Sequence, residues 1–418
     1  MEVYKFGGAS VKNAEGIRNL TAIVGNTEEK LIVVVSALGK TTNALENVVS
    51  LLQDDKEDFR KDLERIKDYH YSIITELDDD KEESLKLSEE FEALYKLAGE
   101  TNRDNYDYLY DQIVSFGEIF SSLIIGWWLN LSGIDCLWMD IREVLITDER
   151  YRDANINWEI SEKKITDFVS ASKQKVIITQ GFIGGSDSGN TTTLGREGSD
   201  FSAGILANIL NADKLTVWKD VPGILNADPD WLKGTYKLDN ISYKEAVELS
   251  FSGAKVIHPK TIKPLHNKSI PLLVRSFIDL SDPGTLISLD ESLAQDIPLY
   301  VKKDNQILLS LMPKDFSFVI SDNLGILFQT FYQQGIKTNL VQTSAVSIAV
   351  CVDYDRARLS LLFEKLKDDY KILTNTGAEL ITLRYYTPES IDKVLSKKEV
   401  LLEQRTRKTI RYVLRDID

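Results

Sequence analysis

Short apolar runs alternate with segments of helical periodicity through the first two thirds of the chain. The runs at residues 3–6 and 31–36 are rich in β-branched and aromatic side chains and predict strands. Between them, apolar residues recur every three or four positions over residues 10–24, which predicts a helix with Ser10 as its N-cap. Further strands are expected at residues 134–139, 176–181 and 215–218, and a further helix at residues 200–210. This alternation predicts a three-layer α/β/α domain with a mainly parallel sheet, which we place at residues 1–285.

A charge-dense segment interrupts the alternation at residues 51–115. Its scattered leucine, isoleucine, phenylalanine and tyrosine side chains fit several amphipathic helices. We therefore expect a helical insertion within the α/β domain.

The pattern changes to smaller units after the turn-forming residues 281–284. Strand, helix, strand, strand, helix and strand signals follow at residues 307–312, 322–334, 338–343, 346–352, 356–366 and 370–374. This order is that of a ferredoxin-like α+β unit, which we place at residues 300–375. A strand, a helix and a strand pair, at residues 379–386, 388–395 and 400–414, predict a second, shortened unit at residues 376–418.

Composition limits the partners and the compartment. A hydrophobic content of 43% with 28% charged residues is typical of a folded soluble protein, and no apolar run reaches the roughly 20 residues of a membrane span. The net charge of −15 disfavours nucleic acid as a partner, because binding a polyanion needs a positive surface. The amino terminus lacks secretory-signal features and the two cysteines lie far apart, so we expect a cytoplasmic protein. The three histidines lack the spacing of a zinc site, so no resident metal is expected.

A glycine pair, Gly7 and Gly8, follows the first predicted strand. Adjacent glycines let the backbone approach a phosphate closely, and the helix expected next would add unpaired amides. A glycine pair alone more often forms a simple tight turn, and with Lys5 nearby the sequence supports a phosphate site and a tight turn about equally.

The segment after the second predicted strand resembles the end of a P-loop at Gly39, Lys40 and Thr41. That motif needs a glycine five residues before Gly39, where this chain has Val34. A P-loop kinase is therefore disfavoured.

Hydroxyl groups and charges gather in two further predicted loops. Ser36 and Thr42 follow the second strand, at the carboxyl end where parallel sheets bind small ligands, although each also fits a helix cap. Residues 189–200 combine glycines and three threonines with Arg196 and Asp200, just before a helix. One cation and one carboxylate so placed fit the two charged ends of an amino acid, which we favour over a plain surface loop.

Other charged residues occupy positions where a ligand could bind. Glu118 begins an apolar helix, where it fits either a binding role or the helix dipole. Lys219 and Asp220 end a strand before a turn, and Lys255 stands among small and apolar residues, a context that is unusual for a surface lysine.

In this order, these segments resemble the aspartokinases (aspartate kinases) of the amino-acid kinase family over nearly the whole chain. The resemblance rests on KFGGAS, SALGKTTN, FGE, TLGREGSD, WKDVPGILNADP and GAKVIHPKT, followed by a tail similar to ACT domains. It implies a transferase that moves the γ-phosphoryl group of ATP to the β-carboxylate of L-aspartate. The cofactors it implies are ATP and Mg²⁺. The product would be 4-phospho-L-aspartate, at the entry to lysine, threonine and methionine biosynthesis. The resemblance also implies a homodimer or higher homo-oligomer formed through the ACT-like region.

The resemblance assigns the candidate residues to three groups. The catalytic residues it implies are Lys5, Gly7, Gly8, Asp200 and Lys255. The aspartate-binding residues it implies are Ser36, Thr42, Glu118, Arg196 and Asp200. The ATP-binding residues it implies are Lys5, Gly7, Gly8, Lys219, Asp220, Leu225, Asp230, Lys255 and Val256. By charge, Arg196 should take the α-carboxylate of aspartate and Glu118 its ammonium group. No general base is needed, because a carboxylate with a pKa near ~4 is ionised at neutral pH.

The chain departs from the usual residues of this family at four positions. Ala9 replaces a threonine near the phosphates, and Lys219, Leu225 and Asp230 replace a threonine, a tyrosine and an arginine beside the nucleotide. These departures bear on the purine contacts rather than on the chemistry.

Two alternative functions stay open. The same fold would suit another acid, such as glutamate or N-acetylglutamate, or a nucleoside monophosphate, although Arg196 with Glu118 favours a free amino acid. A catalytically silent amino-acid sensor would use the ACT-like tail, although retention of Lys5 and Lys255 disfavours it.

Overall fold

The computed structural model describes residues 1–54, 58–78, 85–100, 103–254, 257–291, 297–315 and 321–417. The chain divides into two compact units. The first contains Met1–Ile224, Lys237–Val247 and Ile257–Ala294, and the second contains Leu225–Tyr236, Glu248–Val256 and Gln295–Asp418. Segments 225–236 and 248–256 therefore belong to the second unit although they lie within the sequence range predicted for the first domain.

The first unit is built on a mainly parallel sheet, which confirms the predicted fold class. Its described strands run in the order β3-β5-β2-β1-β8-β10-β11-β9, and β10 with β11 is the antiparallel pair. The bounds are β1 Glu2–Phe6, β2 Leu31–Val35, β3 Cys136–Met139, β5 Val176–Gln180, β8 Lys214–Lys219, β9 Asn240–Ser242, β10 Leu272–Ser276 and β11 Thr285–Ser288. All five residues of β2 are buried, as expected for a central parallel strand covered on both faces.

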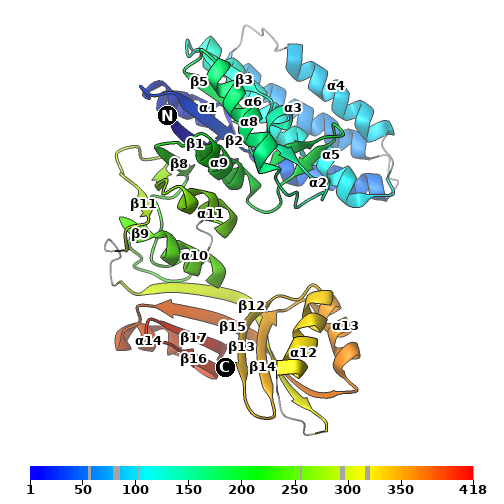
Figure 1. Ribbon diagram of the computed structural model, residues 1–418, viewed down its shortest axis with the longest axis vertical. Helices are drawn as coiled ribbons and strands as arrows, with labels where there is room; N and C mark the ends of the chain where they lie inside the picture. The colour runs from blue at the N-terminus through cyan, green and yellow to red at the C-terminus, as the bar shows by residue number, and fades with distance from the viewer. Residues whose placement is uncertain are drawn as a thin grey trace. The chain divides into compact units, whose positions relative to one another are not determined.

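Helices cover both faces of this sheet (Figure 1). Outside the insertion, the helices from α1 to α11 are α1 Ala14–Gly25, α6 Phe116–Leu131, α7 Ile141–Val144, α8 Trp158–Ala171, α9 Gly198–Ile209, α10 Tyr243–Ser252 and α11 Pro259–Asn267. The end of α10, from Glu248, belongs to the second unit. Helix α6 packs on β2, β3 and β5, whereas α9 packs on β1, β2 and β8. The predicted N-cap Ser10 is wrong, because α1 begins at Ala14 and the side chain of Asn13 accepts the N–H of Gly16.

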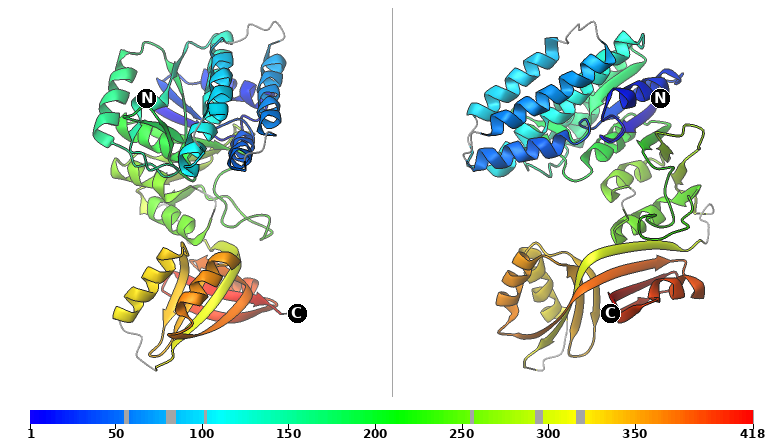
Figure 2. Two further views of the ribbon diagram at one scale, coloured as in Figure 1. Left: turned by 90° about the vertical axis from the view of Figure 1, so that its right-hand side faces the viewer. Right: turned by 180° about the vertical axis from the view of Figure 1, so that it is seen from behind.

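The predicted insertion is helical in its described parts. Residues 51–115 contain α3 Phe59–Leu77, α4 Leu85–Glu100 and α5 Tyr106–Val114, and the helix before them, α2 Thr41–Gln53, ends just inside the predicted range. These helices lie side by side with α6 (Figure 2). Among the described residues, the segment Tyr106–Leu131 is long and apolar enough to cross a membrane, but 89% of its most apolar window is buried within the protein. The segment consists of α5 and α6, and it belongs to the core of the first unit, because α6 packs against both the sheet and the helices of the insertion.

A small sheet carries the threonine-rich loop. Strands β4 Ile146–Thr147, β6 Ile183–Ser186 and β7 Thr191–Thr193 form it in the order β4-β6-β7. The β7 threonines are buried, so this part of the loop is a strand rather than a solvated connection.

The second unit is built on one antiparallel sheet in the order β13-β14-β12-β15-β17-β16. Its strands are β12 Leu299–Pro313, β13 Thr338–Thr343, β14 Ile348–Asp353, β15 Tyr370–Arg384, β16 Lys398–Arg405 and β17 Thr409–Asp416, and its helices are α12 Ser321–Gln333, α13 Arg356–Leu366 and α14 Pro388–Leu395. The strands predicted separately at residues 370–374 and 379–386 are one long strand, β15. Strand β12 is also longer than predicted, and its first residues, Leu299 to Lys303, pair with Leu380 to Arg384 of β15.

These two long strands belong to both ferredoxin-like halves. The four strands of the first half lie in the order β13-β14-β12-β15. The four strands of the second half, read from the other edge of the sheet, lie in the corresponding order β16-β17-β15-β12. The strand missing from the predicted second unit is thus supplied by the beginning of β12. The sheet also curls strongly, since Gln404 of β16 donates a hydrogen bond of 3.3 Å to the carbonyl of Val341 on β13, at its opposite edge.

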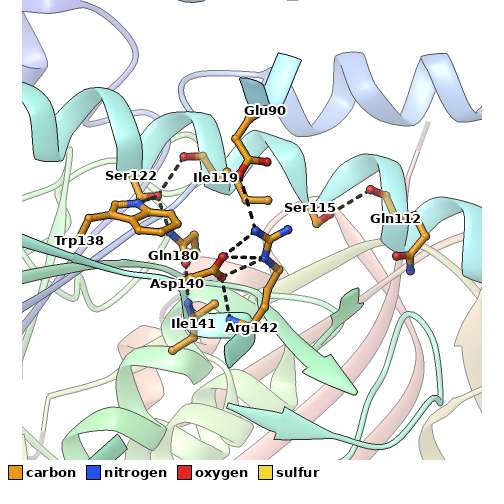
Figure 3. A network of polar contacts seen from close by, with 10 residues as sticks. All are labelled: Glu90, Gln112, Ser115, Ile119, Ser122, Trp138, Asp140, Ile141, Arg142 and Gln180. Atoms are coloured by element: carbon orange, nitrogen blue, oxygen red, sulfur yellow. Dashed lines mark hydrogen bonds and ion pairs between the residues drawn. The ribbon is translucent and has the colours of Figure 1, made fainter. Parts of the chain in front are cut away.

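A buried polar network joins α6, β3, β5 and α7 in the first unit (Figure 3). Gln180 Nε2 donates to Ser122 Oγ at 2.6 Å, and Gln180 Oε1 accepts the N–H of Ile141 at 2.8 Å. Trp138 Nε1 also donates to Ser122 Oγ, at 2.9 Å. The network fixes α6 against the sheet, since Gln180 is fully buried and both ends of its amide are bonded.

We predict that Gln180→Leu lowers the free energy of unfolding by about 1–3 kcal/mol, because it leaves the buried N–H of Ile141 without its acceptor. Urea unfolding followed by tryptophan fluorescence measures this. Gln53→Leu is the matched control, since Gln53 is exposed and its hydrogen bond to the carbonyl of Arg103 can be replaced by water. Equal stability of the two variants would contradict the prediction.

Candidate active site

A cavity of about 650 Å³ lies where β1, β2 and β8 end in the first unit. These parallel strands finish level with one another, since Phe6 pairs with Val35 on one side and Trp218 on the other. The cavity is lined by many of the residues predicted from the sequence, namely Lys5, Gly7, Gly8, Ser36, Thr42, Glu118, Arg196, Asp200, Lys219 and Asp220. Residues up to 215 positions apart thus meet because parallel strands present their carboxyl ends at one edge.

Four predicted site residues are not among those that line this cavity. Leu225 and Asp230 belong to the second unit. Lys255 and Val256 lie outside the described residues. Their proposed nucleotide contacts stay predictions.

Lys5 and Asp200 form a buried ion pair at the centre of the cavity wall. Lys5 Nζ lies 2.6 Å from Asp200 Oδ1, and only 10% and 6% of the two side chains are exposed. Burial tends to raise the pKa of Asp200, but the charges of Lys5 and Lys219 outweigh it and hold that pKa below its usual value. Asp200 is therefore ionised at neutral pH. Its charge keeps the Lys5 ammonium group beside Gly7 and Gly8, which we call the glycine loop.

The glycine loop packs tightly against the loop that follows β2. The N–H of Gly39 donates to the carbonyl of Gly8 at 3.0 Å. A Cβ on Gly8 would lie 2.6 Å from the carbonyl oxygen of Ala37, so no side chain fits there. This loop turns at Ser10, whose N–H donates to Gly7, and it precedes α1 by several residues. The close approach of the Ala37 carbonyl therefore explains why position 8 is a glycine. The helix that was expected directly after the glycines, α1, begins only at Ala14.

Glu118 is a buried carboxylate on the cavity wall, in the first turn of α6. Its Oε1 accepts the N–H of Ala37 at 3.3 Å, while Oε2 has no hydrogen-bond partner among the described residues. Burial raises the pKa of Glu118 to about 8, against the opposing effects of the amide bonds and of Lys5. An unpartnered buried oxygen of this kind suits a ligand that brings its own cation.

Arg196 projects from the loop between β7 and α9 and is exposed. Glu197 beside it adopts the left-handed conformation, with φ of 54°, immediately before α9. This turn places Arg196 on the cavity while Asp200 enters the first turn of the helix. A guanidinium and a buried carboxylate that line the same cavity can hold the two ends of an amino acid.

Glu46, Tyr110 and Arg152 are among the cavity residues that sequence reasoning missed. Tyr110 donates to Glu46 at 2.7 Å, and the guanidinium of Arg152 lies 4.5 Å from the centre of the Tyr110 ring. Tyr110 comes from α5 of the insertion, whose periodicity indicated only packing, and Glu46 comes from α2, just before the insertion. Arg152 adopts the left-handed conformation, with φ of 67°, which the sequence did not signal.

Comparison with known proteins places this site in context. The amino acid kinase family model matches residues 1–276. The chain is 32% identical over 361 residues to lysine-sensitive aspartokinase 3 of Escherichia coli, which covers 84% of this chain and 78% of that protein. It is 28% identical over 393 residues to bifunctional aspartokinase/homoserine dehydrogenase 2 of Arabidopsis thaliana, which covers 90% of this chain and 42% of that protein. The chain spans 32–42% of the length of such bifunctional relatives.

One solved structure is similar over almost the whole chain. The crystal structure of E. coli aspartokinase III in complex with aspartate and ADP superposes with a TM-score of 0.84 at 27% identity. The match covers 99% of this chain and 96% of that one.

We predict that the Glu118 carboxyl titrates near pH 8 in the ligand-free protein, because burial disfavours its charged form. A ¹³C NMR titration of labelled glutamate carboxyls measures this, and Glu118→Gln should remove the signal. Since the pKa in the folded state lies above that in the unfolded state, this group should lower stability progressively as pH rises from about 4 to 8. Titration at the usual glutamate pKa would contradict the assigned burial.

Proposed function

Because the chain belongs to the amino acid kinase family, and within it to the aspartokinases, we propose that it transfers the γ-phosphoryl group of ATP to the β-carboxylate of L-aspartate. The product is 4-phospho-L-aspartate. The observation that carries this proposal is a single cavity lined by the Lys5–Asp200 pair, the glycine loop, Glu118 and Arg196.

The substrate is held by opposite charges at its amino-acid end. Arg196 takes the α-carboxylate, and the unpartnered Oε2 of Glu118 receives the ammonium group. Ser36 and Thr42 lie on the same cavity and offer hydroxyls. This arrangement leaves the β-carboxylate directed towards the phosphates.

Phosphoryl transfer then depends on position and charge rather than on a base. Lys5 and the amides of Gly7 and Gly8 stabilise the charge that spreads over the transferring group. Asp200 orients Lys5 through their ion pair. Mg²⁺ arrives with ATP as part of the substrate complex. Lys219 and Asp220 line the same cavity and are proposed to contact the nucleotide. The nucleotide contacts that the sequence predicts for Leu225, Asp230, Lys255 and Val256 stay predictions.

The second unit serves as an ACT-like regulatory region through which the chain forms a homodimer or higher homo-oligomer. We place the protein in the cytoplasm, in the biosynthesis of lysine, threonine and methionine. The ferredoxin-like sheet of the second unit supports the ACT-like assignment. Light scattering of the full chain tests the oligomeric state.

A hydroxamate assay distinguishes the proposed activity from its rivals. The protein is incubated with MgATP, hydroxylamine and either aspartate, glutamate or N-acetylglutamate, and the trapped acyl hydroxamate is measured. Signal with aspartate is expected. Signal only with glutamate would replace the proposed substrate, and no signal with any acid would favour the amino-acid sensor.

We predict that Arg196→Ala raises the Michaelis constant for aspartate at least about tenfold, because a charge-assisted bond to a carboxylate contributes roughly 1.5–3 kcal/mol. Steady-state kinetics with varied aspartate measure it. Arg150→Ala is the matched control, since Arg150 does not line the cavity and its side chain is 65% exposed. An unchanged Michaelis constant would remove Arg196 from the substrate site.

We predict that Lys5→Ala lowers the turnover number by about two orders of magnitude or more, because its charge acts mainly on the transition state. The control is Lys214→Ala, which removes a lysine from the opposite end of the neighbouring strand. Circular dichroism shows whether each variant is folded. A folded Lys5→Ala protein with full turnover would refute this role.

A further inference from the structure

The helical insertion touches both loops that line the active-site cavity through one side chain, Tyr69 of α3. Its hydroxyl donates a hydrogen bond of 2.5 Å to the backbone carbonyl of Lys12, in the loop after β1. The same hydroxyl lies against the bare backbone of Gly39, in the loop after β2, where an added Cβ would come within 2.7 Å of it. One phenol thus contacts segments 27 residues apart in the chain, counted from residue 12 to residue 39.

These two loops are already joined to each other on the cavity side. Gly39 donates to the carbonyl of Gly8, and Gly8 packs against Ala37 with no room for a side chain. A shift of either loop must therefore move the other. The amides of Gly7 and Gly8 and the hydroxyl of Ser36 would move with them.

The residues next to these contacts, Val11 and Leu38, are fully buried, whereas the outer side of the loops faces α3 across open space. A second cavity of about 720 Å³ separates α3 from the loops there. It is lined by Lys12, Asn13, Gly39, Lys40, Thr41, Ala44, Asn47, Asp62, Arg65, Ile66 and Tyr69. The Tyr69 hydroxyl reaches the loops at this cavity, so its contact adds a restraint to the packing of Val11 and Leu38.

Tyr69 is itself firmly anchored. The next residue, His70, is fully buried, and its ring lies 5.3 Å from that of Phe120 on α6 and 5.9 Å from that of Phe91 on α4. Gly39 has φ of 57°, so its left-handed backbone is the form that needs glycine where the hydroxyl approaches. The position of the phenol is therefore set by the core of the insertion.

We propose that Tyr69 is a positioning residue, which holds the glycine loop and the loop after β2 in register for phosphoryl transfer. The helical insertion thereby acts as part of the catalytic machinery. The proposal rests on the proposed kinase function for its kinetic consequence, but the restraint of the loops does not depend on that function.

The test is Tyr69→Phe, which removes the hydroxyl and keeps the ring. We expect kcat/KM for MgATP to fall about fivefold, the loss typical of one neutral hydrogen bond, with little change in the Michaelis constant for aspartate. We also expect faster hydrogen exchange in peptides covering residues 5–14 and 35–45, with an unchanged melting temperature. The matched control is Tyr71→Phe on the same helix, where the ring packs near Phe91 instead.

The outcomes separate two kinds of failure. If the unaltered protein phosphorylates no acid, the proposed function fails, and the exchange measurement still decides the role of Tyr69. Unchanged exchange and unchanged kcat/KM in Tyr69→Phe would overturn the positioning role. Equal losses in Tyr71→Phe would also overturn it, because they would reflect general loosening of the insertion.

Discussion

The ion pair between Lys5 and Asp200 is the interaction on which the active site depends. Both side chains are nearly excluded from water, and a buried charge is costly unless a partner neutralises it. Removing one partner of such a pair typically costs about 3–5 kcal/mol, because the other is left buried and uncompensated. The pair joins the central strand β1 to the first turn of α9. It therefore couples the sheet to the loop that carries Arg196, and it keeps a lysine ammonium beside the glycines.

The sequence was sufficient to predict this arrangement to the level of strand ends. Parallel strands must present their carboxyl ends together, so the residues that follow β1, β2 and β8 could be grouped without coordinates. Motifs outside the strands were harder to interpret. The start of α1 was misplaced at Ser10 because a serine after glycines is a plausible cap, whereas the chain first makes a turn and then uses Asn13. Glu46 and Tyr110 were missed because amphipathic periodicity does not distinguish a side chain in the core from one that lines a cavity.

The second unit shows a different limit of sequence reasoning. Residues 370–374 and 379–386 were predicted as two strands because the intervening residues, Asn375 to Ala378, are polar or small. In the structure they continue one strand, since both β12 and β15 extend through two ferredoxin-like halves. A shortened second half could not bury its own apolar face, and the beginning of β12 supplies the missing strand. Such non-local pairing leaves no local signal, because Leu299 meets a residue 85 positions later, Arg384.

Two buried carboxylates in one cavity are held in opposite states by their surroundings. Lys5 and Lys219 keep Asp200 ionised, whereas Glu118 meets the N–H of Ala37 and is left with an unpartnered oxygen and a raised pKa. Environments that separate the pKa values of two similar groups indicate separate roles. Asp200 is already neutralised by the protein, so it can orient a lysine but has little charge to offer a substrate. Glu118 forms no ion pair within the described part of the chain, so an incoming ammonium group would both favour its ionised form and remain bound to it. On the proposed function, these electrostatics favour a free amino acid over an N-acylated one, because an acylated nitrogen carries no charge to compensate Glu118.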